Sequence, residues 1–312
     1  MNKKIGIIGA GNVGSSLAFT LATKAVCSHI VIKDIRENIV EAMCLDISQA
    51  SNSAKSHTIV TAAKEAKDLK DCDVVVITAG VPRKPGMSRN ELLLINANIM
   101  KSVIADIKDN CPNTIIIVVS NPLDAMVYAA LKTSGFASNK VIGMAGILDS
   151  SRMSHFIYEK LGYGAGQIQS SVMGGHGDDM VPLTNYSTVA GVCIEELLNK
   201  KDIDDIVQKT KNGGLQIVKL LETGSAYYAP AYSTSRMIES ILNNEKKIYP
   251  CAVLLSGEYG YTNIVAGVPV MLGINGVEKI IKLELNEEQK NQFDKSVLSV
   301  KELTDVLDKE FF

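Results

Sequence analysis

The sequence predicts an α/β protein built on a parallel sheet, because short apolar runs alternate with longer segments of helical periodicity. The runs 74–77 and 115–119 consist almost entirely of branched aliphatic residues, which is typical of strands buried on both faces. Between such runs, segments such as 37–51 repeat apolar residues every three or four positions. This alternation favours right-handed crossovers and a doubly wound sheet.

The first expected strand, residues 4–8, leads into the sequence Gly9-Ala10-Gly11-Asn12-Val13-Gly14 and then into a helical pattern. This spacing predicts a strand, a tight turn and a helix N-terminus that binds a pyrophosphate. Gly9 permits the turn, Gly11 lets the backbone approach the phosphates, and Gly14 lets the helix pack closely on its strand. The unpaired N–H groups and the positive dipole end of that helix favour the phosphate charge.

A second apolar run, residues 28–33, ends in Asp34, about twenty residues beyond the glycines. A carboxylate at this place accepts hydrogen bonds from the ribose hydroxyls of the adenosine half and repels a 2′-phosphate, which favours NAD over NADP. Arg36, two residues further on, leaves NADP use open. A solvated acid that caps the strand end is the alternative for Asp34, but the preceding glycine turn favours an N-terminal Rossmann domain that binds a dinucleotide.

The length of 312 residues exceeds what one hydrophobic core usually supports, so we expect two domains. The run 141–143 is the last strand expected in the first domain. We therefore predict an NAD-binding Rossmann domain at 1–144 and an α+β catalytic and substrate domain at 145–312. The second domain is expected to contain helices, antiparallel strands and a final helix capped by Asn286, at 202–221, 228–242, 253–255, 268–272 and beyond 286.

The composition excludes several classes of protein. Hydrophobic residues at 46% and charged residues at 21% describe a globular protein, and a net charge of −2 gives no field that favours nucleic acid or a membrane surface. The six cysteines form no Cys-x-x-Cys pair, which argues against a zinc site and a disulfide framework. The chain starts almost directly in its first strand, without room for a cleavable leader. We therefore expect a cytoplasmic protein with no metal, no nucleic acid and no membrane as a partner.

Four further segments carry candidate chemistry. The loop 81–89 contains two prolines, a glycine and three cations, so it either folds over an anionic substrate or is a solvated basic loop. Asn121, at a strand end, either orients a carbonyl or hydroxyl group or caps the next helix. Asp149 and Arg152 are spaced for an i,i+3 ion pair on one helix face. His176 has glycine neighbours and is the best acid/base candidate of the four histidines.

Together these segments resemble the NAD-dependent 2-hydroxyacid dehydrogenases of the lactate/malate dehydrogenase family, most closely its lactate-dehydrogenase-like malate dehydrogenases. The resemblance covers essentially the whole chain and rests on motifs in the family order, at 9–14, Asp34, 82–89, 120–124, 148–152, 174–178 and 224–231. Several motifs in the correct order are far more specific than any one of them. The alternative interpretations of the individual residues lose weight accordingly.

This resemblance implies a role for each matched residue. His176 exchanges a proton with the substrate oxygen as hydride moves, and Asp149 fixes the tautomer of His176 and stabilises the imidazolium. Arg152 holds the substrate carboxylate, Arg89 polarises the carbonyl when its loop closes, and Asn121 hydrogen-bonds the reacting oxygen. The cofactor is NAD, and its binding is assigned to Gly9, Ala10, Gly11, Asn12, Val13, Gly14, Asp34, Asn96, Val119 and Asn121.

Arg83 matches the position at which the family selects its substrate. A cation there pairs with the second carboxylate of oxaloacetate, whereas pyruvate leaves the cation unpaired, so we expect malate as the substrate. A one-residue shift in loop register would give this role to Lys84. The alternatives are a lactate or other 2-hydroxyacid dehydrogenase and a non-catalytic NAD-binding protein. The resemblance also implies a place in the tricarboxylic acid cycle and a homo-oligomer, with a tetramer favoured over a dimer.

Overall fold

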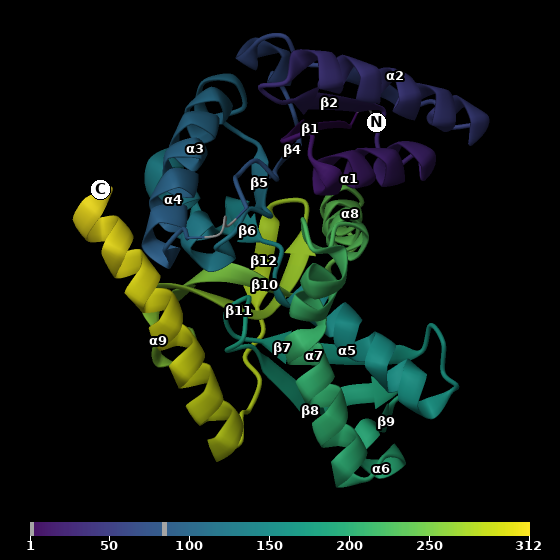
Figure 1. Ribbon diagram of the computed structural model, residues 1–312, viewed down its shortest axis with the longest axis vertical. Helices are drawn as coiled ribbons and strands as arrows, with labels where there is room; N and C mark the ends of the chain where they lie inside the picture. Colours follow the sequence, from purple (N-terminus) through teal and green to yellow (C-terminus); the bar gives the residue numbers. More distant parts are fainter. Residues whose placement is uncertain (1–2, 83–85) are drawn as a thin grey trace.

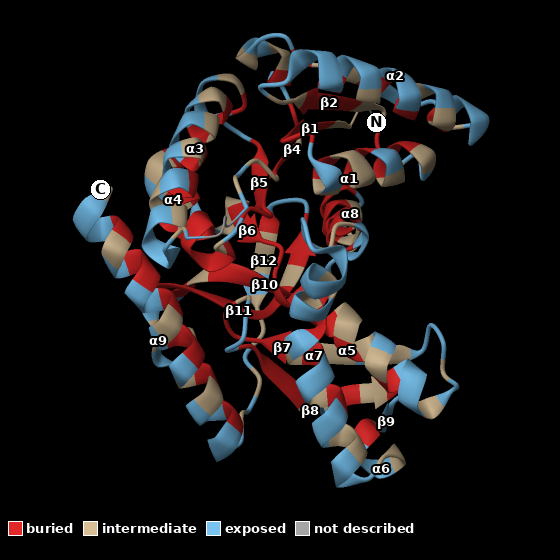
Figure 2. Ribbon diagram, viewed as in Figure 1, coloured by how far each residue is buried: buried red, intermediate tan, exposed pale blue. Residues whose placement is uncertain are grey.

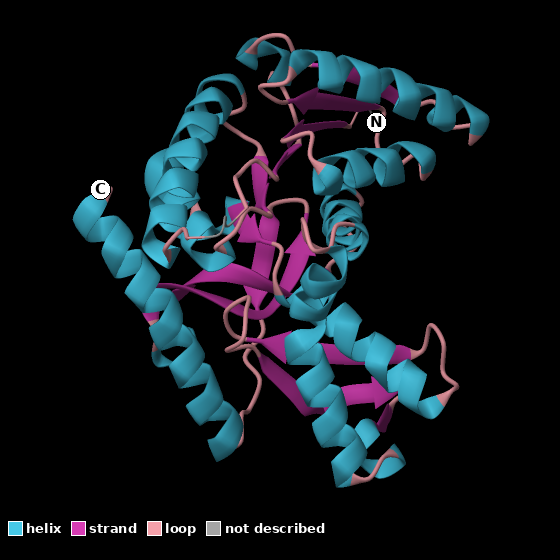
Figure 3. Ribbon diagram, viewed as in Figure 1, coloured by secondary structure: helices cyan, strands magenta, loops and turns pink. Residues whose placement is uncertain are grey.

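The computed structural model describes residues 3–82 and 86–312, and helices flank a central sheet on both faces (Figures 1 and 3). The strands are β1 (Lys4–Ile8), β2 (His29–Lys33), β3 (Ile59–Ala62), β4 (Val74–Ile77), β5 (Ile115–Val118), β6 (Val141–Gly143), β7 (Ile168–Met173), β8 (Val181–Val189), β9 (Val192–Cys193), β10 (Lys247–Ser256), β11 (Thr262–Gly273) and β12 (Gly276–Ile280). The α-helices are α1 (Asn12–Thr23), α2 (Glu37–Ser53), α3 (Arg89–Asn110), α4 (Leu123–Ser134), α5 (Gly146–Leu161), α6 (Ile194–Leu197), α7 (Lys200–Leu221), α8 (Tyr228–Leu242) and α9 (Glu287–Glu310).

The first six strands form a parallel sheet in the order β3-β2-β1-β4-β5-β6, which confirms the predicted doubly wound arrangement. The strand order reverses between β1 and β4. Ligands of such sheets bind beyond the carboxyl ends of the strands at this reversal. The fold therefore places the glycine turn after β1 beside the segment that follows β4.

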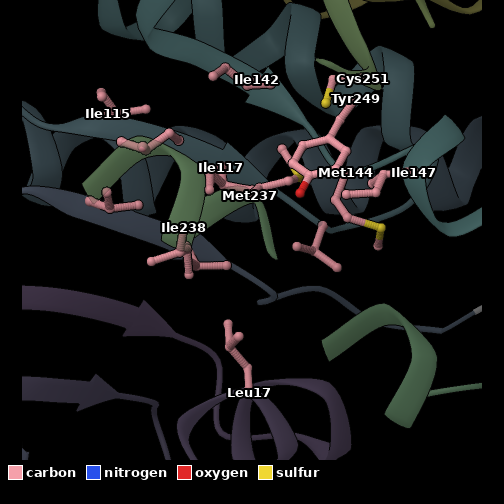
Figure 4. Close-up of a cluster of buried hydrophobic side chains, with 14 of the residues drawn as sticks. Leu17, Ile115, Ile117, Ile142, Met144, Ile147, Met237, Ile238, Tyr249 and Cys251 are labelled. Carbon is pink, nitrogen blue, oxygen red and sulfur yellow. The ribbon is translucent and has the colours of Figure 1, made fainter. Parts of the chain in front are cut away.

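Alternate residues of the central strands bury two separate cores. Val74 and Val76 of β4 face the core that includes Leu17 of α1 and Ile238 of α8, while Val75 and Ile77 face the core under α3 and α4. Figure 4 shows part of the first core, and Figure 2 shows the buried strands between helices whose outer faces are exposed. Burial on both faces explains why these strands consist of continuous aliphatic residues.

The large sheet continues into the second half of the chain. Gly143 of β6 pairs with Ala252 of β10, and β10, β11 and β12 extend the sheet in antiparallel fashion. A Cβ on Gly143 would lie 2.6 Å from a Val127 methyl group and 2.9 Å from the Ala252 methyl group, so glycine allows this close approach. β10 and β11 are longer than the predicted 253–255 and 268–272. The domain boundary at 144/145 stays a prediction.

The long helices begin as their N-terminal residues predict. The Asn286 side chain accepts the Gln289 N–H at 2.9 Å, which confirms the expected cap of α9. Ser88 and Glu91 form the corresponding capping box of α3, which makes Arg89 the first residue of that helix. Of the helices in the described ranges, none combines the length and the apolar character that a membrane span needs.

Candidate active site

The glycine turn has one open position and two crowded ones. Gly9 has φ +112°, and a Cβ there would lie 2.6 Å from the Ala79 amide nitrogen. A Cβ on Gly14 would lie 1.9 Å from the Gly9 carbonyl oxygen, because α1 packs directly on the turn. A Cβ on Gly11 would have no described heavy atom within 4 Å. The backbone itself thus requires Gly9 and Gly14, while Gly11 faces free space in front of the α1 N-terminus.

Asp34, immediately after β2, is tied to the glycine turn. Its carboxylate accepts the Ala10 N–H at 2.6 Å and the Arg36 side chain at 3.0 Å. Partial burial alone would raise the pKa of Asp34, but the hydrogen bonds from Arg36 and Ala10 lower it overall. The residue is therefore an ionised acceptor beside the turn. The Arg36 guanidinium pairs with Asp34 and is largely exposed.

Asn96 of α3 connects the ends of two neighbouring strands. Its amide oxygen accepts the Val81 N–H at 2.8 Å, and its amide nitrogen donates to the carbonyls of Val81 and Asn121 at 3.1 and 2.7 Å. The buried Asn96 side chain thus fixes the main chain at Asn121. The helix that follows Asn121 begins at Leu123 with no side-chain cap described, so the capping alternative for Asn121 is wrong.

His176, Asp149 and Arg152 form a continuous charged group. His176 lies after β7, and its Nδ1 is 2.9 Å from Asp149 Oδ2, while the other Asp149 oxygen accepts from Arg152 at 3.0 Å. Asp149 and Arg152 occupy the first two turns of α5. Burial alone would lower the pKa of His176, but the neighbouring Asp149 carboxylate raises it above the usual range. The Asp149 bond engages Nδ1 and leaves Nε2 to face a reacting oxygen.

A cavity of about 230 Å³ extends from His176 and Arg152 to the carboxyl edge of the sheet, and Asp149 is not part of its lining. Some of the predicted site residues line it together with residues of α7 and of the 224–231 segment, and the lining includes Val13, Val119, Asn121, Arg152, His176, Gly214, Ala226 and Pro230. Gly213 and Gly214 let α7 pack over Arg152, since a Cβ on Gly214 would lie 3.3 Å from the guanidinium. Arg152 Nε is buried without a described partner, so a donor remains for a carboxylate.

Arg89 lies on another side of His176. It lines a second hollow of about 400 Å³ together with His176, Asp178 and Asp179. Arg83, the predicted substrate selector, and Lys84 lie outside the described residues. The role of Arg83 therefore stays a prediction from the sequence.

The sequence pattern missed three features of the site. Asp124 of α4 and Ser296 of α9 both accept hydrogen bonds from the turn that carries His176. The glycine pair in the middle of α7 covers Arg152. Two adjacent glycines inside a helical pattern indicate such a close packing contact and could have been used to predict it.

The fold and this site point to the class of nucleotide-dependent oxidoreductases. The chain belongs to the lactate/malate dehydrogenase family: residues 3–143 match its NAD binding domain, and residues 147–311 match its alpha/beta C-terminal domain. A malate dehydrogenase of Aliarcobacter butzleri is 62% identical over 100% of this chain and 99% of that protein. A malate dehydrogenase of Sulfurimonas denitrificans is 58% identical over 99% of this chain and 97% of that protein.

Solved structures agree with this assignment. Malate dehydrogenase from Cryptosporidium parvum has a TM-score of 0.96 and 39% identity, and the match covers 99% of this chain and 100% of that one. Lactate dehydrogenase from Cryptosporidium parvum, solved with lactic acid and nicotinamide adenine dinucleotide, has a TM-score of 0.94 and 38% identity over 99% of this chain and 98% of that one. The fold is thus shared by both activities of the family, and NAD is the cofactor of its first domain.

Proposed function

We propose that this protein is an NAD-dependent malate dehydrogenase that interconverts (S)-malate and oxaloacetate. The observation that carries the proposal is the His176–Asp149 pair at 2.9 Å beside Arg152, at the cavity that reaches the glycine-turn edge of the sheet. The relatives named malate dehydrogenase at 53–62% identity support the same activity. A non-catalytic NAD-binding protein would not need this arrangement of acid, base and arginine.

Each side chain contributes a distinct step. NAD, when bound, supplies the carbon that accepts or returns the hydride. His176 Nε2 takes the proton of the malate hydroxyl, and Asp149 holds the other ring nitrogen and stabilises the imidazolium that forms. Arg152 pairs with the carboxylate beside the reacting carbon, which fixes orientation as well as charge. Arg89 and Asn121 bind the reacting oxygen once the loop closes and water is excluded.

We infer that Arg83 selects oxaloacetate over pyruvate. An enclosed arginine that lacks the second carboxylate is an unpaired charge, which costs on the order of several kcal/mol, or about a thousandfold in kcat/KM. The test follows NADH absorbance with each substrate for the wild type and Arg83→Gln. Arg83→Gln should lose the preference for oxaloacetate, and Lys84→Gln serves as the matched control. A wild type that reduces pyruvate equally well would refute this role.

Lactate dehydrogenase is the second candidate, because the lactate dehydrogenase of Cryptosporidium parvum has nearly the same fold with a TM-score of 0.94. The same substrate comparison decides between them. If neither substrate is reduced, the binding-protein interpretation takes precedence.

We also propose a cytoplasmic homotetramer that acts in the tricarboxylic acid cycle. The six free cysteines support a reducing compartment. Large apolar side chains exposed on or beside α1, α2 and α8, among them Phe19, Ile35, Leu45 and Tyr228, support burial against further subunits. Sedimentation equilibrium should give four chains per particle; a dimer would contradict the tetramer.

A further inference from the structure

The turn that carries His176 is clamped by three different elements. The Gly174 N–H donates to a β11 carbonyl at 2.8 Å, and the Gly175 N–H donates to Ser296 Oγ of α9 at 2.7 Å. The His176 N–H donates to Asp124 Oδ2 of α4 at 2.9 Å. Two of the three acceptors are side chains, and only Asp124 can bring a charge.

Asp124 is an unusual residue for a purely structural anchor. It is buried, and its Oδ1 has no hydrogen-bond partner among the described residues. Burial raises the pKa of Asp124 to about 6, although the His176 N–H and the His176 ring oppose this shift. A neutral acceptor such as the Ser296 hydroxyl would hold the turn without burying a carboxylate.

We propose that Asp124 is a positioning residue for the reaction, which fixes the main chain of His176 and, together with Asp149, stabilises its imidazolium form. The proposal rests on the proposed function, in which His176 is the acid/base. Several described charged groups lie around Asp124 and His176. They are Asp149 and Arg152 on α5, Arg89 at the start of α3, and Asp178 and Asp179 beyond the turn. α9 faces the same hollow with Ser296, Ser299, Val300 and Leu303.

Asp124→Asn separates the two roles, because an amide oxygen can still accept the His176 N–H but carries no charge. Loss of a nearby negative charge disfavours the imidazolium, so the pKa of His176 should fall by about one pH unit. Oxaloacetate reduction needs the imidazolium, so its kcat/KM should decline at lower pH than in the wild type. Malate oxidation needs the neutral ring and should begin at correspondingly lower pH.

Three control variants distinguish charge from packing. Ser296→Ala removes the neighbouring hydrogen bond without a change of charge, so it should lower kcat but leave the pH at which the rate declines unchanged. Asp73→Asn removes a carboxylate that accepts the Lys4 N–H at 2.8 Å at the opposite edge of the sheet. This variant should change neither kcat nor the pH at which the rate declines. Asp124→Glu keeps the charge and should keep the pH profile of the wild type, even if kcat falls.

A nitrogen-15 NMR titration of the histidine rings gives a readout that does not depend on turnover. The chain has four histidines, so His29, His57 and His155 serve as internal references. Only His176 should shift in Asp124→Asn. Superimposable His176 titrations for the wild type and Asp124→Asn would overturn the proposal, as would a displaced titration in Ser296→Ala. If the wild type fails to reduce oxaloacetate, the proposed function fails, and this titration still decides whether Asp124 stabilises the imidazolium.

Discussion

Gly11→Ala tests whether phosphates bind at the open position of the glycine turn. Gly11 caps α1 at φ −79° and ψ −172°, a conformation that alanine adopts without strain, and its added Cβ meets no described heavy atom within 4 Å. Alanine is a poorer cap by about 1 kcal/mol. The lower entropy of the unfolded chain offsets about 0.4–1 kcal/mol of this loss. The free energy of unfolding of the cofactor-free protein should therefore change by less than about 1 kcal/mol.

NADH affinity should respond far more strongly. A pyrophosphate held by the α1 N–H groups has to lie against the Gly11 backbone, and a methyl group there displaces it. Loss of one charge-assisted hydrogen bond costs about 1.5–3 kcal/mol, which corresponds to roughly a 10- to 150-fold higher Kd. Fluorescence titration with NADH measures the Kd, and thermal unfolding without NADH measures stability.

Gly14→Ala is the matched variant in the same turn. Its Cβ would lie 1.9 Å from the Gly9 carbonyl oxygen, so α1 must move and the cofactor-free protein should lose several degrees in Tm. The two substitutions should therefore have different effects: Gly11→Ala weakens NADH binding, and Gly14→Ala lowers stability. If Gly11→Ala binds NADH as tightly as the wild type, the phosphates do not lie against this turn and the reasoning from its open face is wrong.

Two further predictions concern the catalytic group. Asp149→Asn removes the partner that raises the pKa of His176, so oxaloacetate reduction should fall about 10²- to 10⁴-fold and decline at lower pH; an unchanged pH profile measured by NADH absorbance would contradict this. Gly214→Ala places a methyl group 3.3 Å from the Arg152 guanidinium, so KM for oxaloacetate should rise several-fold while the Kd for NADH stays the same. If KM for oxaloacetate and the Kd for NADH rose by the same factor, α7 would affect the whole cleft and not Arg152 alone.

The parallel half of the fold could be predicted from the sequence because its information is local. A strand such as β4 is buried on both faces and therefore consists only of Val and Ile residues. β10 was predicted too short, because Lys247 is exposed and Pro250 interrupts the apolar run, although both belong to the strand. Its pairing with β6 depends on a contact between Ala252 and Gly143, which no local pattern encodes.

The site shows the same division. Asp149 and Arg152 lie three residues apart, and His176 is marked by its glycine neighbours, so each could be found within a short segment. Asp124 and Ser296 could not, because their hydrogen bonds to the His176 turn span 52 and 121 residues of sequence. Only the packing of α4 and α9 against the turn reveals what these two side chains do.

Asp124 also lowers the stability of the fold at neutral pH, and the direction of this effect follows from its raised pKa. Its folded pKa of about 6 lies above the ordinary value of 3.8, so its ionised form weakens the fold at neutral pH by up to about 3 kcal/mol. This loss should disappear as the pH falls through 6 toward 3.8. A residue with this effect needs an explanation other than stability. The adjacent imidazolium supplies one, because a second carboxylate near His176 stabilises the charged form of the ring that oxaloacetate reduction requires.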